Sequence, residues 1–210
     1  MANPAQPAPI ERDVARLFSL VSEALAAATD ALLAGEPRQA SRVVESDHAV
    51  DALTDELTGR IWEDLDRLLP QDEQLRELIG LLTILPELER SADLAEHIAQ
   101  RGVSQLGRDM PPVTRGIVQR MSDVALEMWH EAASSYVRSE DAGDALNQAD
   151  EELDILTRRL TAEVGSSDLA PSVAAQVTLL GRFYERLGDH AVNLAKRAGG
   201  LRGGPSVSGR

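Results

Sequence analysis

The sequence predicts an all-α protein made of two tandem, duplicated three-helix bundles with six long helices. Apolar residues recur at intervals of three and four along nearly the whole chain, which is the spacing of a buried helical stripe. No stretch shows the alternation of apolar and polar residues that marks a half-buried strand. The chain is 43% hydrophobic but only 3% aromatic, so we expect a core of Leu, Val, Ile and Ala.

The duplication is visible as two repeated segments. Residues 88–101 align without a gap on residues 184–197, and an Asp-x-x-x-Asp-x-Leu-x-x-x-Leu pattern occurs once in each half. Four of the matched positions are acidic in both halves. They pair Asp47 with Asp150, Asp51 with Asp154, Glu89 with Glu185, and Asp93 with Asp189.

The first half, residues 10–102, is predicted to hold three helices. Gly35 ends the first helix, and Pro37 suits the first turn of the second. Pro70 ends the second helix, because proline cannot continue it. Residues 1–9, rich in Ala and Pro, are expected to be disordered. The three predicted helices cover about 10–33, 37–69 and 72–101.

The second half, residues 112–198, repeats this plan. Residues 103–111 are predicted to link the two halves, and the Gly-rich and Ser-rich residues 199–210 are predicted to form a flexible tail. The helices of this half are expected at about 112–139, 144–164 and 168–197.

Composition excludes several classes of function. A net charge of -14 argues against nucleic acid or an anionic membrane as a direct partner. The absence of cysteine excludes disulfides and thiolate metal sites. The N-terminus lacks the apolar region of a secretory signal, and the densest apolar run, residues 78–85, is far shorter than the ~20 residues of a membrane helix. We therefore expect a cytoplasmic protein without membrane insertion.

The repeated acids break the apolar pattern. Asp47 lies between Val43 and Val50 on the inner stripe of its helix, and Glu89 continues the inward line of its own helix. Two carboxylates about 6 Å apart repel by roughly 3 kcal/mol at an effective dielectric near 20, so a cluster needs compensation. Hard cations with oxygen ligands (iron, manganese, magnesium or calcium) would supply it. The predicted ligands are Asp47, Asp51, Glu89 and Asp93 in one half, and Asp150, Asp154, Glu185 and Asp189 in the other.

Two other interpretations of the acids stay open at this point. They could line solvated faces of a metal-free helical adaptor. Alternatively, Glu45-x-x-His48 and Glu127-x-x-His130 match the Glu-x-x-His motif of di-iron oxidases and ferritin-like iron stores. The chain shows no nucleophile–base pair and no Gly-rich phosphate loop, so we predict that it is not an enzyme.

Residues 177–195, centred on Tyr184-Glu185-Arg186-Leu187-Gly188-Asp189-His190, resemble the signature of the PhoU family of bacterial phosphate-transport accessory and regulatory proteins. The resemblance extends to Leu88-Glu89-Arg90-x-x-Asp93 and to both Asp-x-x-x-Asp segments. Two departures fall in the first half, where Ala92 replaces the glycine of the motif and Pro86 interrupts the helix.

The resemblance implies a function as well as a fold. It implies a multinuclear metal cluster in each three-helix bundle and repression of the phosphate-starvation response. Such proteins bridge the ATPase of the phosphate ABC transporter and a membrane sensor histidine kinase, and they are commonly homodimers.

Overall fold

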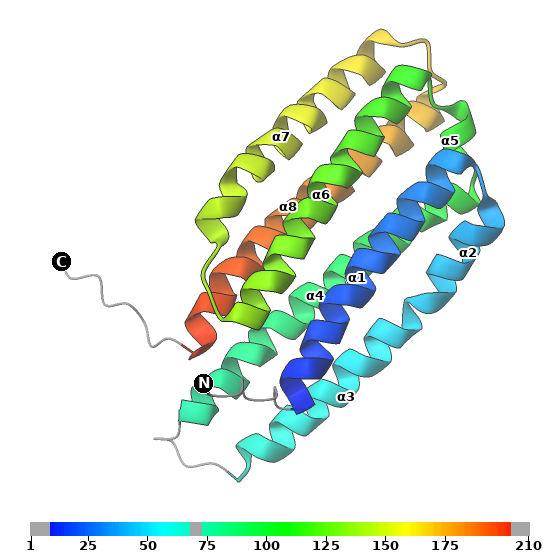
Figure 1. Ribbon diagram of the computed structural model, residues 1–210. Helices are drawn as coiled ribbons and strands as arrows, with labels where there is room; N and C mark the ends of the chain where they lie inside the picture. The colour runs from blue at the N-terminus through cyan, green and yellow to red at the C-terminus, as the bar shows by residue number, and fades with distance from the viewer. Residues whose placement is uncertain (1–8, 68–72, 203–210) are drawn as a thin grey trace, which may run out of the picture.

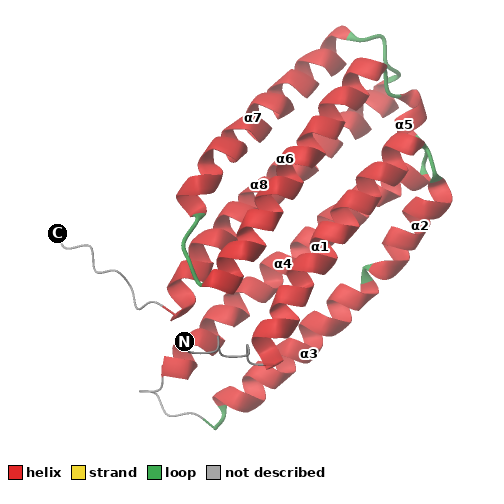
Figure 2. Ribbon diagram, in the orientation of Figure 1, coloured by secondary structure: helices red, strands yellow, loops and turns green. Residues whose placement is uncertain are grey.

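The structure, a computed structural model, describes residues 9–67 and 73–202, and all regular elements in these ranges are helices (Figure 2). This confirms the all-α prediction. The first half contains α1 (Pro9–Ala34), α2 (Pro37–Ser46), α3 (His48–Leu65) and α4 (Glu73–Val103), and the second contains α6 (Pro112–Arg138), α7 (Gly143–Ser166) and α8 (Pro171–Arg202), with the short α5 (Leu106–Asp109) between them.

The ends of the chain differ from their predicted limits. Pro9 already belongs to α1, and α8 continues through residues 199–202, which were predicted to lie in the tail. The remainder of both predicted disordered ends, residues 1–8 and 203–210, lies outside the described residues, as does the predicted stop at Pro70.

Helices α1 and α6, which hold matching places in the two halves, end in the same way. Gly35 and Ser139 follow them with positive φ values of 68° and 57°. At each end one backbone N–H bonds three residues back and the next bonds five residues back, which is the Schellman arrangement. Gly35 adopts this conformation without steric cost, and Ser139 shows that the same stop forms without glycine.

The predicted second helix consists of two helices that meet at Asp47. The backbone of Asp47 keeps helical angles, φ −58° and ψ −37°, so α3 follows α2 along one edge of the molecule (Figure 1). The N–H of Val50 bonds the Asp47 carbonyl at 2.8 Å, a contact three residues apart that tightens the chain locally. The predicted linker contains α5, which begins after Gln105 in a left-handed conformation.

The two halves share one hydrophobic core. Helices α1, α4, α6 and α8 form its centre, where α1 and α8 each pack against both α4 and α6. The α2–α3 pair and α7 lie on opposite sides of this group (Figure 1). Phe18 of α1 contacts both Trp129 and Tyr136 of α6, with ring centroids 6.0 and 5.5 Å apart. The duplicated bundles are therefore fused through apolar and aromatic packing.

Buried hydroxyl groups also join the halves. Thr29 of α1 donates a hydrogen bond to the Leu25 carbonyl and lies 2.7 Å from the Tyr184 hydroxyl of α8. The Ser122 hydroxyl of α6 donates to Thr29 at 3.0 Å. Each group is buried, and each is satisfied by another member of the network, as buried polar groups require.

Helix α1 is more apolar than the sequence reading recognised. By length and composition alone, Ile10–Ala34 would suffice to cross a membrane. In the fold its apolar stripe, which includes Leu17, Val21 and Leu25, is fully buried against the other central helices. The apolar character of α1 is therefore accounted for by its place in the core.

Candidate metal centre

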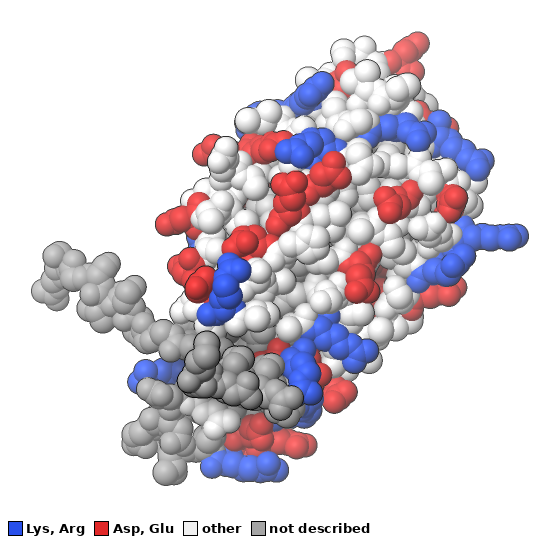
Figure 3. Space-filling view, in the orientation of Figure 1, with Lys and Arg blue, Asp and Glu red and all other residues white. Residues whose placement is uncertain are grey.

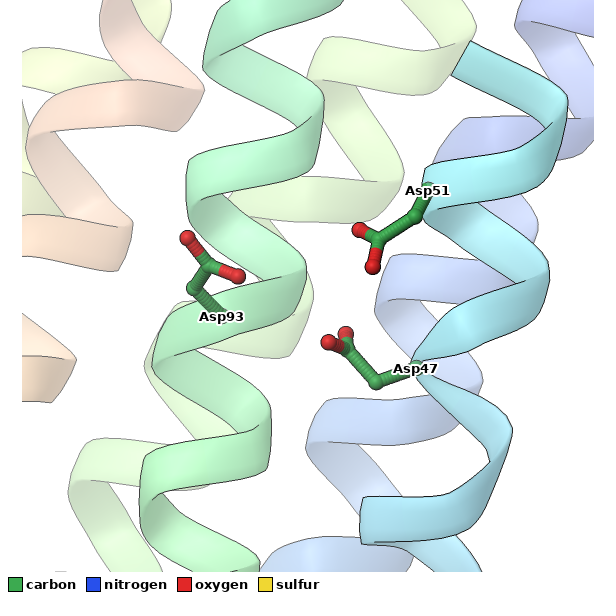
Figure 4. A group of neighbouring side chains, drawn as sticks. All are labelled: Asp47, Asp51 and Asp93. Carbon is green, nitrogen blue, oxygen red and sulfur yellow. The ribbon is translucent and has the colours of Figure 1, made fainter. Parts of the chain in front are cut away.

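Three aspartates of the first half converge between α3 and α4. Asp47 and Asp51 stand one turn apart at the start of α3, and Asp93 faces them from α4 (Figure 4). One oxygen from each carboxylate lies within 4.8 Å of the others. The four-residue spacing that places two of these acids on one helical face was visible in the sequence, whereas the approach of the third depends on the packing of α4.

The electrostatics of this cluster are unfavourable without a cation. Burial, followed by the charges of Asp51, Glu96 and Asp93, raises the pKa of Asp47 to about 6, with His48 acting in the opposite direction. Burial and then Asp51 also raise the pKa of Asp93. Within residues 9–67 and 73–202, none of the three aspartates forms an ion pair with a basic side chain.

Glu89 lies near this cluster but does not join the set of three oxygens. Burial raises its pKa, and the charges of Asp51, Asp93 and Asp55 add to that effect. The sequence reading missed Asp55 and also Glu96, whose charge contributes to raising the pKa of Asp93. Their spacing offered a signal, because Asp55 extends the four-residue series of α3 and Glu96 follows Asp93 by about one turn.

The matching acids of the second half are less tightly gathered. Among the described residues, the set whose carboxylate oxygens lie within 4.8 Å of one another belongs to the first half alone. Burial raises the pKa of Asp150, with Asp189, Asp154 and Glu185 adding to it and the Lys196 ammonium opposing it. These four acids, Asp150, Asp154, Glu185 and Asp189, are thus electrostatic neighbours without a common coordination point.

Glu185 is already paired in this half. Its carboxylate accepts a hydrogen bond from Arg182, which lies one turn earlier on α8, and the two side chains form an ion pair. A metal ion would have to compete with that guanidinium. This pairing is one reason why the second set is less open to a cation than the first.

Gly188 permits the close packing of α7 on α8. A Cβ at this position would lie 2.6 Å from Leu153 Cδ1, 3.3 Å from Asp150 Oδ1 and 3.4 Å from Met128 Cε. A larger residue here would therefore push α7 away from α8. The matching residue of the first half is Ala92, whose side chain is buried.

The di-iron pattern is not assembled. Glu45, His48, Glu127 and His130 are all exposed, and they lie on helices of different halves. In the described part of the chain, no histidine belongs to a group of three close ligand atoms. His190 is buried and bonds Ser91 of α4 at 2.8 Å.

Fold and site together define a duplicated all-α protein whose two halves carry acids at matched positions. A family model described as the PhoU domain matches residues 14–102 and 118–198, which is most of the chain. The chain belongs to the PhoU family.

Individual relatives agree with this assignment. The "phosphate-specific transport system accessory protein PhoU homolog 2" of Mycobacterium tuberculosis is 32% identical over 190 residues, which cover 86% of this chain and 87% of the relative. A PhoU homolog of Rhizobium meliloti is 24% identical over 195 residues, covering 89% and 81%. The crystal structure of PhoU from Pseudomonas aeruginosa has a TM-score of 0.84 at 23% identity, and the match covers 91% of this chain and 94% of that one.

Proposed function

We propose that this chain is a non-catalytic accessory protein of phosphate transport that binds hard metal ions through its first acid cluster. The names of its relatives support the transport role. The observation that favours metal binding is the approach of the Asp47, Asp51 and Asp93 carboxylate oxygens to within 4.8 Å of one another. Three negative charges at this separation are costly unless a cation offsets them.

The donor set suits an oxygen-preferring ion. Asp47, Asp51 and Asp93 would hold it, and Glu89 and Glu96 would contribute charge from the same side of α4. Manganese, magnesium, calcium and iron accept all-carboxylate ligation, whereas zinc and copper favour nitrogen and sulfur. When bound, the ion would supply the positive charge that the surrounding side chains lack.

Metal binding is tested on purified protein stripped with EDTA and then dialysed. Calorimetric titration with Mn²⁺ should show saturable binding that Asp51→Asn weakens at least tenfold. The matched variant Asp154→Asn, in the less compact second set, should weaken it less. Equal affinity of wild type and Asp51→Asn for Mn²⁺ would reject the first cluster as the site. If none of the four metals bound, the protein would instead be interpreted as a metal-free adaptor.

We also propose a regulatory role, in which the chain acts in the cytoplasm as a negative regulator of the phosphate-starvation response. It would do so, as a homodimer, by bridging the transporter ATPase and the sensor histidine kinase. The drawn face of the molecule supports a protein partner over nucleic acid, because its described acidic and basic side chains are interspersed without a continuous basic surface (Figure 3).

Genetics tests the regulatory part separately from the metal. Deleting the gene should raise expression of phosphate-starvation genes in phosphate-rich medium. Expression of the same genes in a strain with a chromosomal Asp51→Asn allele then shows whether that repression depends on the acid cluster. Unchanged expression after deletion would reject the regulatory role, whatever the calorimetry shows.

A further inference from the structure

A cavity of about 230 Å³ lies beside the aspartate cluster, between α1, the α2–α3 junction and α4. Its floor is apolar and includes Ala24, Val50 and Ala92. Its charged lining residues are acidic, with one carboxylate from each of the three structural neighbours: Glu23 from α1, Asp47 from the junction and Glu96 from α4. Among the residues that the structure describes, no basic side chain lines this cavity.

Two matching positions of the second half carry bulkier apolar side chains. They replace Val50 and Ala24, whereas the position of Ala92 becomes a glycine on α8. Leu153 and Met128 are buried, and both lie against Gly188. The matched pairs are Val50 with Leu153, Ala92 with Gly188 and, counted back eleven residues from the equivalent helix ends at Gly35 and Ser139, Ala24 with Met128.

The second half also carries a lysine at a position where the first half has a neutral side chain. Lys196 is the only lysine of the sequence, and its stem crosses Gly143, where a Cβ would lie 2.7 Å from the lysine Cε. Its ammonium acts on Asp150. The repeat aligns Lys196 with Gln100, a neutral side chain that donates a hydrogen bond to Glu96 at 2.9 Å. An open space and a missing positive charge therefore occur together in the first half.

We propose that this cavity receives a lysine side chain from a partner protein. The four-carbon stem would lie on Ala24, Val50 and Ala92, and the ammonium would lie among the three carboxylates. A cavity of 150 Å³ is known to hold a benzene ring, so the space here suffices for a butyl stem and its ammonium. A metal ion would use the aspartate oxygens but would leave the apolar floor uncovered.

Lysine fits this space better than arginine. A compact ammonium on a flexible apolar stem can meet three separate carboxylates, whereas the planar guanidinium is suited to bidentate pairing with one. Asp47 belongs both to this cavity and to the aspartate cluster, so the lysine side chain and a metal ion would compete for it.

The first test uses n-butylammonium as the probe of a lysine side chain, with EDTA present. Methyl resonances of Ala24 and Ala92 should shift saturably in NMR spectra as the probe is added. Ammonium ion, which lacks the stem, and n-butanol, which lacks the charge, should each bind at least tenfold more weakly. An equal response to ammonium would show that the site binds only a counter-ion, and this would overturn the proposal. Equal binding of n-butanol would show that the charge is not recognised, and this would overturn it too.

Variants then locate the site. Val50→Leu combined with Ala24→Met introduces the larger side chains of the second half and should weaken binding of n-butylammonium at least tenfold. Asp47→Asn should weaken this binding by a similar factor. Asp30→Asn, an exposed acid on α1 outside the cavity, should leave affinity unchanged. If the double variant fails to fold, Val50→Leu alone serves the same purpose. Undiminished binding in both the filled variant and Asp47→Asn would refute the assignment.

The source of the ammonium is resolved with two further ligands. Nα-acetyl-lysine methylamide carries the backbone of a protein lysine, and 1,4-diaminobutane is a free amine of similar length. The blocked lysine should bind at least as tightly as the diamine. A tenfold preference for the diamine would assign the cavity to a small polyamine and overturn the docking of a protein side chain.

Discussion

Removing the charge of Asp47 is expected to stabilise the metal-free protein at neutral pH. The pKa of Asp47 is raised from 3.8 to about 6, and each pKa unit corresponds to about 1.4 kcal/mol between protonation states. The ionised carboxylate would therefore cost about 3 kcal/mol if it were shielded from solvent. Since Asp47 is only half-buried, screening reduces the expected gain of Asp47→Asn to about 1–2 kcal/mol.

The gain should depend on pH in a defined direction. Below pH 3.8 the carboxyl is protonated in both the folded and the unfolded protein, so the substitution removes no charge. As the pH rises through the interval between 3.8 and about 6, the unfolded chain releases its proton first and the wild type loses stability. The difference in the free energy of unfolding between variant and wild type therefore reaches its full value above about pH 6.

Urea unfolding followed by circular dichroism at 222 nm, with EDTA present, measures this difference. Asp47→Asn should gain about 1–2 kcal/mol at pH 7.5, or roughly 2–8 °C in Tm, and almost nothing at pH 4. Glu45→Gln, an exposed acid on α2, is the control for loss of one negative charge. A gain that is the same at both pH values, or a net loss at pH 7.5, would refute the electrostatic explanation.

Three further predictions concern the buried residues Gly188, Tyr184 and His190. Gly188→Ala should destabilise the protein by about 1–2 kcal/mol in urea unfolding, because its Cβ would collide with Leu153, and adding Leu153→Val should restore most of that loss. Tyr184→Phe removes the 2.7 Å hydrogen bond to Thr29 and should cost about 1 kcal/mol, measured as a lowered Tm; an unchanged Tm would show that this bond adds no net stability. Burial lowers the pKa of His190, so the contribution of His190 to stability should fall as the pH drops below 6.5, opposite in sign to that of Asp47. Unfolding curves over a pH series should show that His190→Asn removes this contribution.

Local sequence signals located the helices because their ends are chemically marked. Gly35 and Pro37 fixed the turn between α1 and α2, and Pro112 fixed the start of α6. The interruption at Asp47 left no such mark, since its backbone stays helical and only the hydrogen bonding changes. The same residue nevertheless stood out as an acid on an apolar stripe, and the structure places it in the aspartate cluster.

Long-range packing decided what the sequence could not. The repeat predicted two equivalent sets of four acids, but only the first set places three oxygens together among the described residues. Side chains outside the acidic motifs also differ, because Arg182 pairs with Glu185 and Lys196 acts on the pKa of Asp150. Likewise, the periodicity of α1 and α4 marked their buried faces without revealing that part of each face is covered by the other half.

The shared core has a consequence for how the chain could be divided. A single repeat made on its own would leave exposed the apolar surface of α1 and α4 that α6 and α8 cover, together with the Thr29 hydroxyl. It could bury that surface by pairing with another repeat at sufficient concentration. Because α5 and its flanking residues tether the repeats, the pairing is intramolecular, with an effective concentration in the millimolar range or above. In the linked chain the two repeats associate within one molecule, whereas separate repeats would have to associate by a concentration-dependent bimolecular step.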